Sequence, residues 1–86
     1  MSDDAVRDDV VRAIDLALDG KWDEAHDLAQ RHEGDPTAAW VHAVLHTIEG
    51  DLANSRYWYR QAGRPANVDA DPQEELRSIR AQVAGD

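Results

Sequence analysis

Cysteine is absent from this chain of 86 residues. Without thiols the protein can form neither a disulfide framework nor a thiolate metal site, so the packing of apolar side chains must hold its core together. No apolar run approaches the roughly 20 residues that a membrane-spanning helix needs. The first ten residues, MSDDAVRDDV, are acidic where a secretory signal has a basic segment. We therefore expect a soluble, cytoplasmic protein that has no signal peptide and makes no contact with a membrane.

Basic residues are scarce, because 9 lysines and arginines stand against 18 aspartates and glutamates, for a formal net charge of −9. Residues 1–51 contain 13 of the acidic and 4 of the basic residues, which accounts for the whole net charge. Residues 52–86 contain 5 of each and are neutral. An acidic half repels phosphate backbones, so the charge pattern argues against general nucleic-acid binding.

No segment alternates between polar and apolar residues as a strand does, and every segment has the apolar spacing of an amphipathic helix. The sequence predicts an all-α protein whose five helices span about 3–18, 22–33, 36–49, 52–62 and 71–84. Each break contains glycine or proline, and the breaks are expected near Gly20, Gly34-Asp35, Gly50 and Pro65–Asp69. Two of the helices begin with an Asp-Pro pair, which suits a helix start because Asp caps it and Pro is tolerated at its first position.

The turns repeat at a spacing of 30 residues, from Gly20 to Gly50. Five positions after these glycines stand Ala25 and Ser55, two small residues that suit a close approach of helices. The pattern resembles a tetratricopeptide repeat, although Leu52 replaces the expected aromatic residue and the usual period is about 34 residues. We predict a single domain, 1–86, with a first hairpin at 1–33, a second at 36–63 and a capping helix at 71–84. A less regular bundle of four or five helices is the alternative.

The apolar positions of these helices define a candidate core. On the helix that starts at residue 36, Val41, Val44, Leu45 and Ile48 form one stripe. Two successive aromatic residues cannot share a helix face, so Tyr59 is expected in the core and one of its two predecessors beside a groove. The predicted core contains Val10, Ile14, Ala25, Val41, Leu45, Ile48, Tyr59 and Ile79.

Groups that can bind a metal or move a proton lie on one side of the helix at 36–49. His42, His46 and Glu49 have the spacing i, i+4, i+7, which places them within an arc of about 60°. Two such histidines can converge on one metal ion, and the carboxylate is a third ligand or a base. The trio flanks the apolar stripe, so we expect it at the edge of a groove. His26, with Gln30 one turn after it, can reach the same groove from the preceding helix.

The rim of this groove has its own polar candidates. Asp51 and Asn54 stand where the next helix starts and where backbone N–H groups favour anions. Tyr57 or Trp58 is expected beside them. Each residue also has a structural interpretation: the histidines can form a hydrogen-bonded cluster with Glu49, and Asp51 can be a helix cap.

Residues 22–63 resemble a family of small bacterial and fungal proteins of uncharacterised function. Members have a His before a Gln, a Trp-His segment, a second His, an acid, an Asp, an Asn and a Tyr-Trp pair before a Gly. The corresponding residues in this chain are His26, Gln30, Trp40, His42, His46, Glu49, Asp51, Asn54, Tyr57, Trp58 and Gly63. Val41 separates Trp40 from His42, and Thr47 stands where such proteins tend to have Arg. The resemblance implies no particular activity, but it points to the same polar residues.

Two classes of function remain open. The leading hypothesis is a small binding or scaffold module that presents its polar groove to a protein or small molecule. The alternative is a protein that binds a divalent metal such as zinc, or a small metal-dependent enzyme, through His26, His42, His46 and Glu49. A homodimer is a further alternative, because a chain this small gains stability from pairing. The sequence contains no phosphate-binding loop and no dinucleotide fingerprint.

Overall fold

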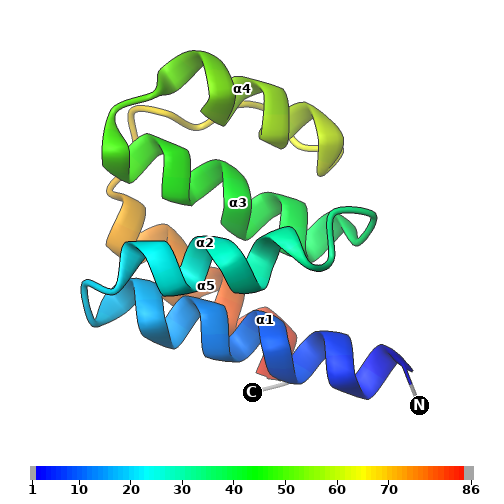
Figure 1. Ribbon diagram of the computed structural model, residues 1–86. Helices are drawn as coiled ribbons and strands as arrows, with labels where there is room; N and C mark the ends of the chain where they lie inside the picture. Colours follow the sequence, from blue (N-terminus) through cyan, green and yellow to red (C-terminus); the bar gives the residue numbers. More distant parts are fainter. Residues whose placement is uncertain (1, 85–86) are drawn as a thin grey trace.

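Five α-helices form the protein in the computed structural model, which describes residues 2–84, with side chains from residue 4 onward (Figure 1). The helices are α1 (Ser2–Leu18), α2 (Trp22–Gln30), α3 (Pro36–Glu49), α4 (Leu52–Gln61) and α5 (Pro72–Ala84). No β-strand occurs in the described part of the chain, which confirms the predicted all-α fold. None of the five helices is both long and apolar enough to cross a membrane.

The helices follow one another through the molecule in chain order. Figure 1 shows α1, α2, α3 and α4 as successive layers, with α5 behind them. Helix α3 is central, because it packs against each of the other four helices. The tetratricopeptide-like repeat remains a prediction.

Glycines in the left-handed conformation follow three of the helices, α1, α3 and α4. The φ angle is 80° at Gly20, 87° at Gly50 and 72° at Gly63. After α3, the N–H of Gly50 donates to the Thr47 carbonyl and the N–H of Asp51 to the His46 carbonyl. This pair of bonds satisfies the last carbonyls of the helix, and it needs a residue that tolerates positive φ.

The predicted close approach between helices occurs at Ser55. Its side chain is fully buried, and its hydroxyl donates to the Ala43 carbonyl at 2.9 Å. The same hydroxyl lies 2.6 Å from that of Thr47. A larger residue at this position would separate α4 from α3, so Ser55 determines how closely the two helices pack.

The core is built around α3, whose nine residues from Ala38 to His46 are all buried. Because helices cover α3 on several sides, residues outside its apolar stripe are buried as well. Seven of the eight predicted core residues are buried: Val10, Ile14, Ala25, Val41, Leu45, Tyr59 and Ile79.

The eighth, Ile48, was placed in the core wrongly. It is 42% exposed. Periodicity groups it with Leu45, but α3 ends one residue later at Glu49, and burial ends at His46. The periodicity gives the direction in which a side chain points. It does not show how far along α3 the neighbouring helices extend to cover that side chain.

Helix α5 is attached to this core through a carboxylate. Glu75 accepts hydrogen bonds from the indole N–H of Trp40 at 2.8 Å and from the hydroxyl of Tyr59 at 2.7 Å. Burial raises the pKa of Tyr59, and the bond to Glu75 raises it further, so this hydroxyl stays protonated. Leu76 and Ile79, both fully buried, complete the contact.

Candidate metal centre

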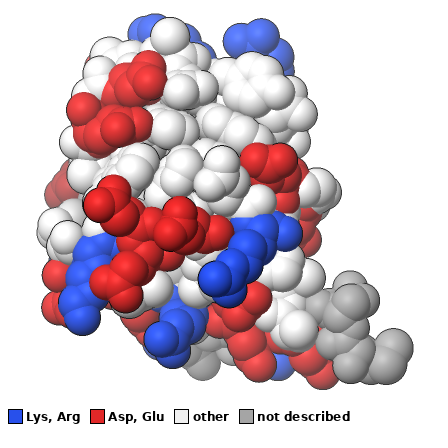
Figure 2. All heavy atoms as spheres, in the orientation of Figure 1, with Lys and Arg blue, Asp and Glu red and all other residues white. Residues whose placement is uncertain are grey.

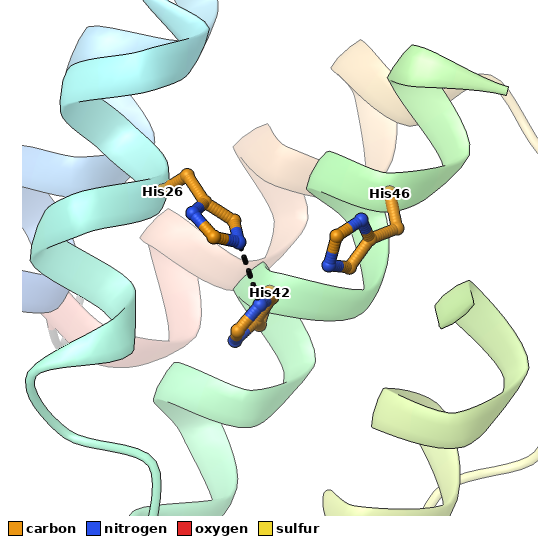
Figure 3. Close-up of side chains that lie close together, drawn as sticks. All are labelled: His26, His42 and His46. Carbon is orange, nitrogen blue, oxygen red and sulfur yellow. Dashed lines mark hydrogen bonds between the residues drawn. The ribbon is translucent and has the colours of Figure 1, made fainter. Parts of the chain in front are cut away.

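Three histidines converge between α2 and α3. His26 lies on α2, and His42 and His46 lie one turn apart on α3. Figure 3 shows the rings of His26 and His46 turned toward His42. Each of the three residues offers a ring nitrogen, and these nitrogens all lie within 4.8 Å of one another. The three histidines therefore converge as predicted, whereas the fourth predicted residue, Glu49, is hydrogen-bonded to Nδ1 of His46 and belongs to a separate group.

The closest pair of nitrogens joins the two helices. Nε2 of His26 lies 3.0 Å from Nε2 of His42, so one ring donates to the other. The His42 and His46 rings stack with centroids 4.9 Å apart, and those of His26 and His46 are 5.3 Å apart. All three rings thus surround one small volume.

Two tryptophans border the cluster. Trp22 stacks on His26 with ring centroids 4.7 Å apart, and Trp58 stacks on His42 at 3.9 Å. The indole N–H of Trp22 donates to the Leu45 carbonyl at 2.6 Å, which fixes this ring against α3. Flat rings held in this way restrict the rotation of the two imidazoles.

Glu49 determines which nitrogen of His46 faces the cluster. Its Oε1 lies 2.5 Å from Nδ1 of His46. A carboxylate at Nδ1 favours the tautomer that has its proton there, and so leaves Nε2 as a free lone pair. Metal-binding histidines are commonly oriented by a partner of this kind.

Two of the three imidazoles, those of His42 and His26, are disfavoured in their charged form. The pKa of His42 falls to about 3, because burial disfavours the charged form and the neighbouring His26 and His46 add repulsion. Burial also lowers the pKa of His26, with His46 as the second cause. Three carboxylates act against this shift on His26, in decreasing order Asp27, Glu49 and Asp23. Neutral imidazole is the form that binds a metal ion.

One nitrogen of the cluster is fully buried without a hydrogen bond. His42 is 2% exposed, and its Nδ1 is buried without a partner among the described residues. An unsatisfied buried polar atom costs about 1–3 kcal/mol. This atom is not the Nε2 that pairs with His26, so an ion held at Nε2 would leave Nδ1 without a partner.

The burial of His42 and His46 corrects one expectation. The sequence placed them at a groove edge, but their exposed fractions are only 2% and 6%. The apolar stripe of α3 lies to one side of them, and α2 and Trp58 cover the other. Only His26 is half-buried and reaches the surface.

The rim residues divide between the cluster and the surface. Trp58 is the aromatic residue that meets the histidines, whereas Tyr57 is 47% exposed and touches only the edge of Trp58 among the rings. The carboxylate of Asp51 accepts from the N–H and side-chain amide of Asn54, so it caps α4. Gln30 is exposed on α2.

Trp22 was missed by the sequence analysis. A signal for it existed, because Trp22 lies four residues before His26 on the same helix and therefore on the same face. Its contact with Leu45 on α3 depends on the packing of two helices and has no local signature.

No protein-family model, curated protein or solved structure matches this chain. The resemblance to an uncharacterised family stays a prediction. The histidine cluster is therefore the feature of the molecule that bears on its function.

Proposed function

We propose that the protein binds one divalent transition-metal ion, preferably zinc, through His26, His42 and His46. The observation that supports this is the convergence of their three nitrogens within 4.8 Å of one another. Imidazole nitrogen suits zinc, copper and nickel, whereas magnesium and calcium prefer oxygen ligands. Cysteine is absent, so nitrogen is the softest donor at this site.

Movements of the rings would convert the cluster into a ligand set, because its nitrogens lie up to 4.8 Å apart and would have to approach by up to about 1.5 Å. In a tetrahedral zinc site with Zn–N distances of about 2.0–2.1 Å, the ligand nitrogens lie about 3.3 Å apart. The nitrogens of His26 and His42, now 3.0 Å apart, must separate by a few tenths of an ångström. The hydrogen bond between these two rings is then exchanged for two metal bonds.

The surroundings also favour a cation. Glu49 holds the His46 ring, and Asp23 and Asp27 lie close enough to act on His26. Figure 2 shows acidic side chains, with basic ones between them, over the part of the molecule where Figure 1 draws α1 and α2, and Asp23 and Glu24 lie in the first turn of α2. Negative charge around a buried site attracts a divalent cation and offsets part of the cost of removing its water.

Calorimetric titration of metal-stripped protein with zinc chloride tests the proposal. We expect one equivalent to bind. His26→Ala removes a ligand at the half-buried position, so it should weaken binding by more than the about 10–100-fold that loss of an orienting partner costs. His32→Ala is the matched control, because His32 bonds to Asp9 outside the cluster. Equal affinity of the two variants, or no binding at all, would contradict the proposal.

A binding or scaffold module is the second candidate function. An open hollow of about 660 Å³ lies on α1 and supports it. The hollow is lined by Val11, Arg12, Asp15, Leu16, Leu18 and Asp19. A partner that docks there would leave zinc binding unchanged, so the two functions are separable by titration in the presence of that partner.

A further inference from the structure

We infer that the bound ion keeps one coordination position for water and activates it to attack uncharged carbonyl compounds. The inference rests on the proposed metal site. Three protein ligands and one water are the ligand set of hydrolytic zinc, whereas structural zinc has four protein ligands. The question is therefore whether this chain supplies a fourth ligand.

Within the described residues, no fourth side chain joins the three histidines. A second group that could hold an ion contains His46, Glu49 and Asp51, so it shares only His46 with the first. The carboxylate of Glu49 is hydrogen-bonded to Nδ1 of His46. The nitrogen of His46 that faces the cluster is Nε2, on the other side of the ring. Asp51 is engaged as the cap of α4. Neither carboxylate faces the point where the three nitrogens converge.

The tryptophans cannot fill the position either. An indole nitrogen is a donor only and has no lone pair for a metal. Trp22 already uses its N–H on the Leu45 carbonyl. The stacked rings of Trp22 and Trp58 instead provide apolar walls beside the ion. An ion held by the three imidazoles therefore completes its coordination with a ligand from solvent.

Solvent reaches the cluster from the side of His26. His42 and His46 are buried, but His26, Trp22 and Trp58 are each partly exposed. The two buried ligands keep the ion out of bulk solvent, and the exposed side of His26 is the route by which a small molecule would approach it. A partly enclosed ion of this kind is a stronger Lewis acid than a fully hydrated one.

The chemistry that follows is hydrolysis of an ester. Zinc lowers the pKa of a bound water to about 7, so the water loses a proton to solvent and becomes a nucleophile. Its oxygen forms a bond to the carbonyl carbon, and the bond from that carbon to the leaving oxygen then breaks. The leaving oxygen takes a proton from solvent, and a new water replaces the carboxylic acid product on the ion.

The charge near the site selects the substrate class. The carboxylates of three residues interact electrostatically with His26, and they are Asp23, Asp27 and Glu49. Their negative charge disfavours the approach of an anion. Phosphate esters are therefore poor substrates. The inner faces of Trp22 and Trp58 are stacked on His26 and His42, but the exposed parts of the two rings suit a neutral, partly apolar acyl group.

The open coordination position can be tested without measuring activity. Cobalt(II) is substituted for zinc, and its visible absorption is recorded before and after adding acetohydroxamate. A solvent-held position predicts a change in the cobalt bands, because the hydroxamate replaces the water. An unchanged spectrum in protein that holds one cobalt ion would overturn the inference while the metal site stands. Failure to bind either ion would overturn the metal site itself.

The activity is tested with 4-nitrophenyl acetate as a neutral probe and 4-nitrophenyl phosphate as an anionic one. Because free imidazoles also attack this acetate, the comparison is between zinc-loaded and metal-stripped protein. We expect zinc to raise the steady-state rate at least about 100-fold on the acetate, the lower end of what a single catalytic group contributes, and to leave the phosphate intact. His26→Ala should lose the zinc-dependent rate and His32→Ala should keep it. Equal rates with and without bound zinc would refute the inference.

Discussion

His42 is a titratable side chain held almost entirely away from water. Its pKa of about 3 lies below the ordinary value of 6.5, because burial and the two neighbouring histidines disfavour its charged form. The protein keeps this ring neutral at the expense of stability in acid, since the unfolded chain can take up the proton and the folded chain cannot.

The stability of the metal-free protein should therefore fall as the pH drops from about 6.5 toward 3. In this window the unfolded state binds more protons than the folded state, so the free energy of unfolding rises with pH, by up to about 1.4 kcal/mol per pH unit for one histidine. Urea denaturation at a series of pH values with chelator present measures the slope. His42→Gln should flatten it, and parallel slopes for the variant and the parent protein would contradict this assignment.

Two apolar residues on α3 differ in burial by their place along the helix. Leu45 is fully buried, so Leu45→Ala should lower the free energy of unfolding by about 2–5 kcal/mol through lost burial and a cavity. Ile48→Ala is the matched control, and it should cost less than about 1 kcal/mol because Ile48 is 42% exposed. Chemical denaturation measures both. Similar losses of unfolding free energy in the two variants would show that Ile48, at the end of α3, is buried like Leu45.

At the scale of the elements, the turn after α3 depends on one backbone conformation. Gly50→Val should destabilise the protein by more than about 1 kcal/mol, because φ is 87° there and a side chain is strained in the left-handed region. An added Cβ meets nothing within 4 Å at Gly50, so the cost comes from the backbone alone.

Gly34→Ala provides the comparison for that turn. Gly34 also has open space around its Cβ position, but its φ is not in the left-handed region. Replacement there should be neutral or stabilise by up to about 1 kcal/mol, because alanine restricts the unfolded chain. Thermal melts measure the melting temperatures of Gly50→Val and Gly34→Ala. Equal changes in melting temperature would show that backbone strain at Gly50 does not determine the loss of stability.

At the scale of the whole molecule, metal binding should couple to stability. An ion that binds only the folded protein stabilises it by about 2.7 kcal/mol at a free concentration 100 times its dissociation constant. For a domain of this size, that shift raises the melting temperature by more than about 10 °C. Differential scanning calorimetry with and without zinc measures it. The rise should persist in His32→Ala and disappear in His26→Ala, and a rise in both would place the ion elsewhere.

The sequence alone determined the features that depend on near neighbours along the chain. The helices and their breaks follow from backbone propensity and from glycine, aspartate and proline at the turns. The all-α class and the breaks near Gly20 and Gly50 could be predicted for this reason. The shared face of His42 and His46 is likewise a property of one helix.

Tertiary structure decided what depends on more than one helix. It brought His26 to within 3.0 Å of His42, stacked Trp22 and Trp58 beside them, and buried a cluster that the pattern placed at a groove edge. It also left Ile48 exposed. A periodic pattern shows the direction in which a side chain points, but burial depends on which helices cover that direction and how far they extend. That information is spread over residues distant in the chain, and so the site emerges only when α2, α3 and α4 pack together.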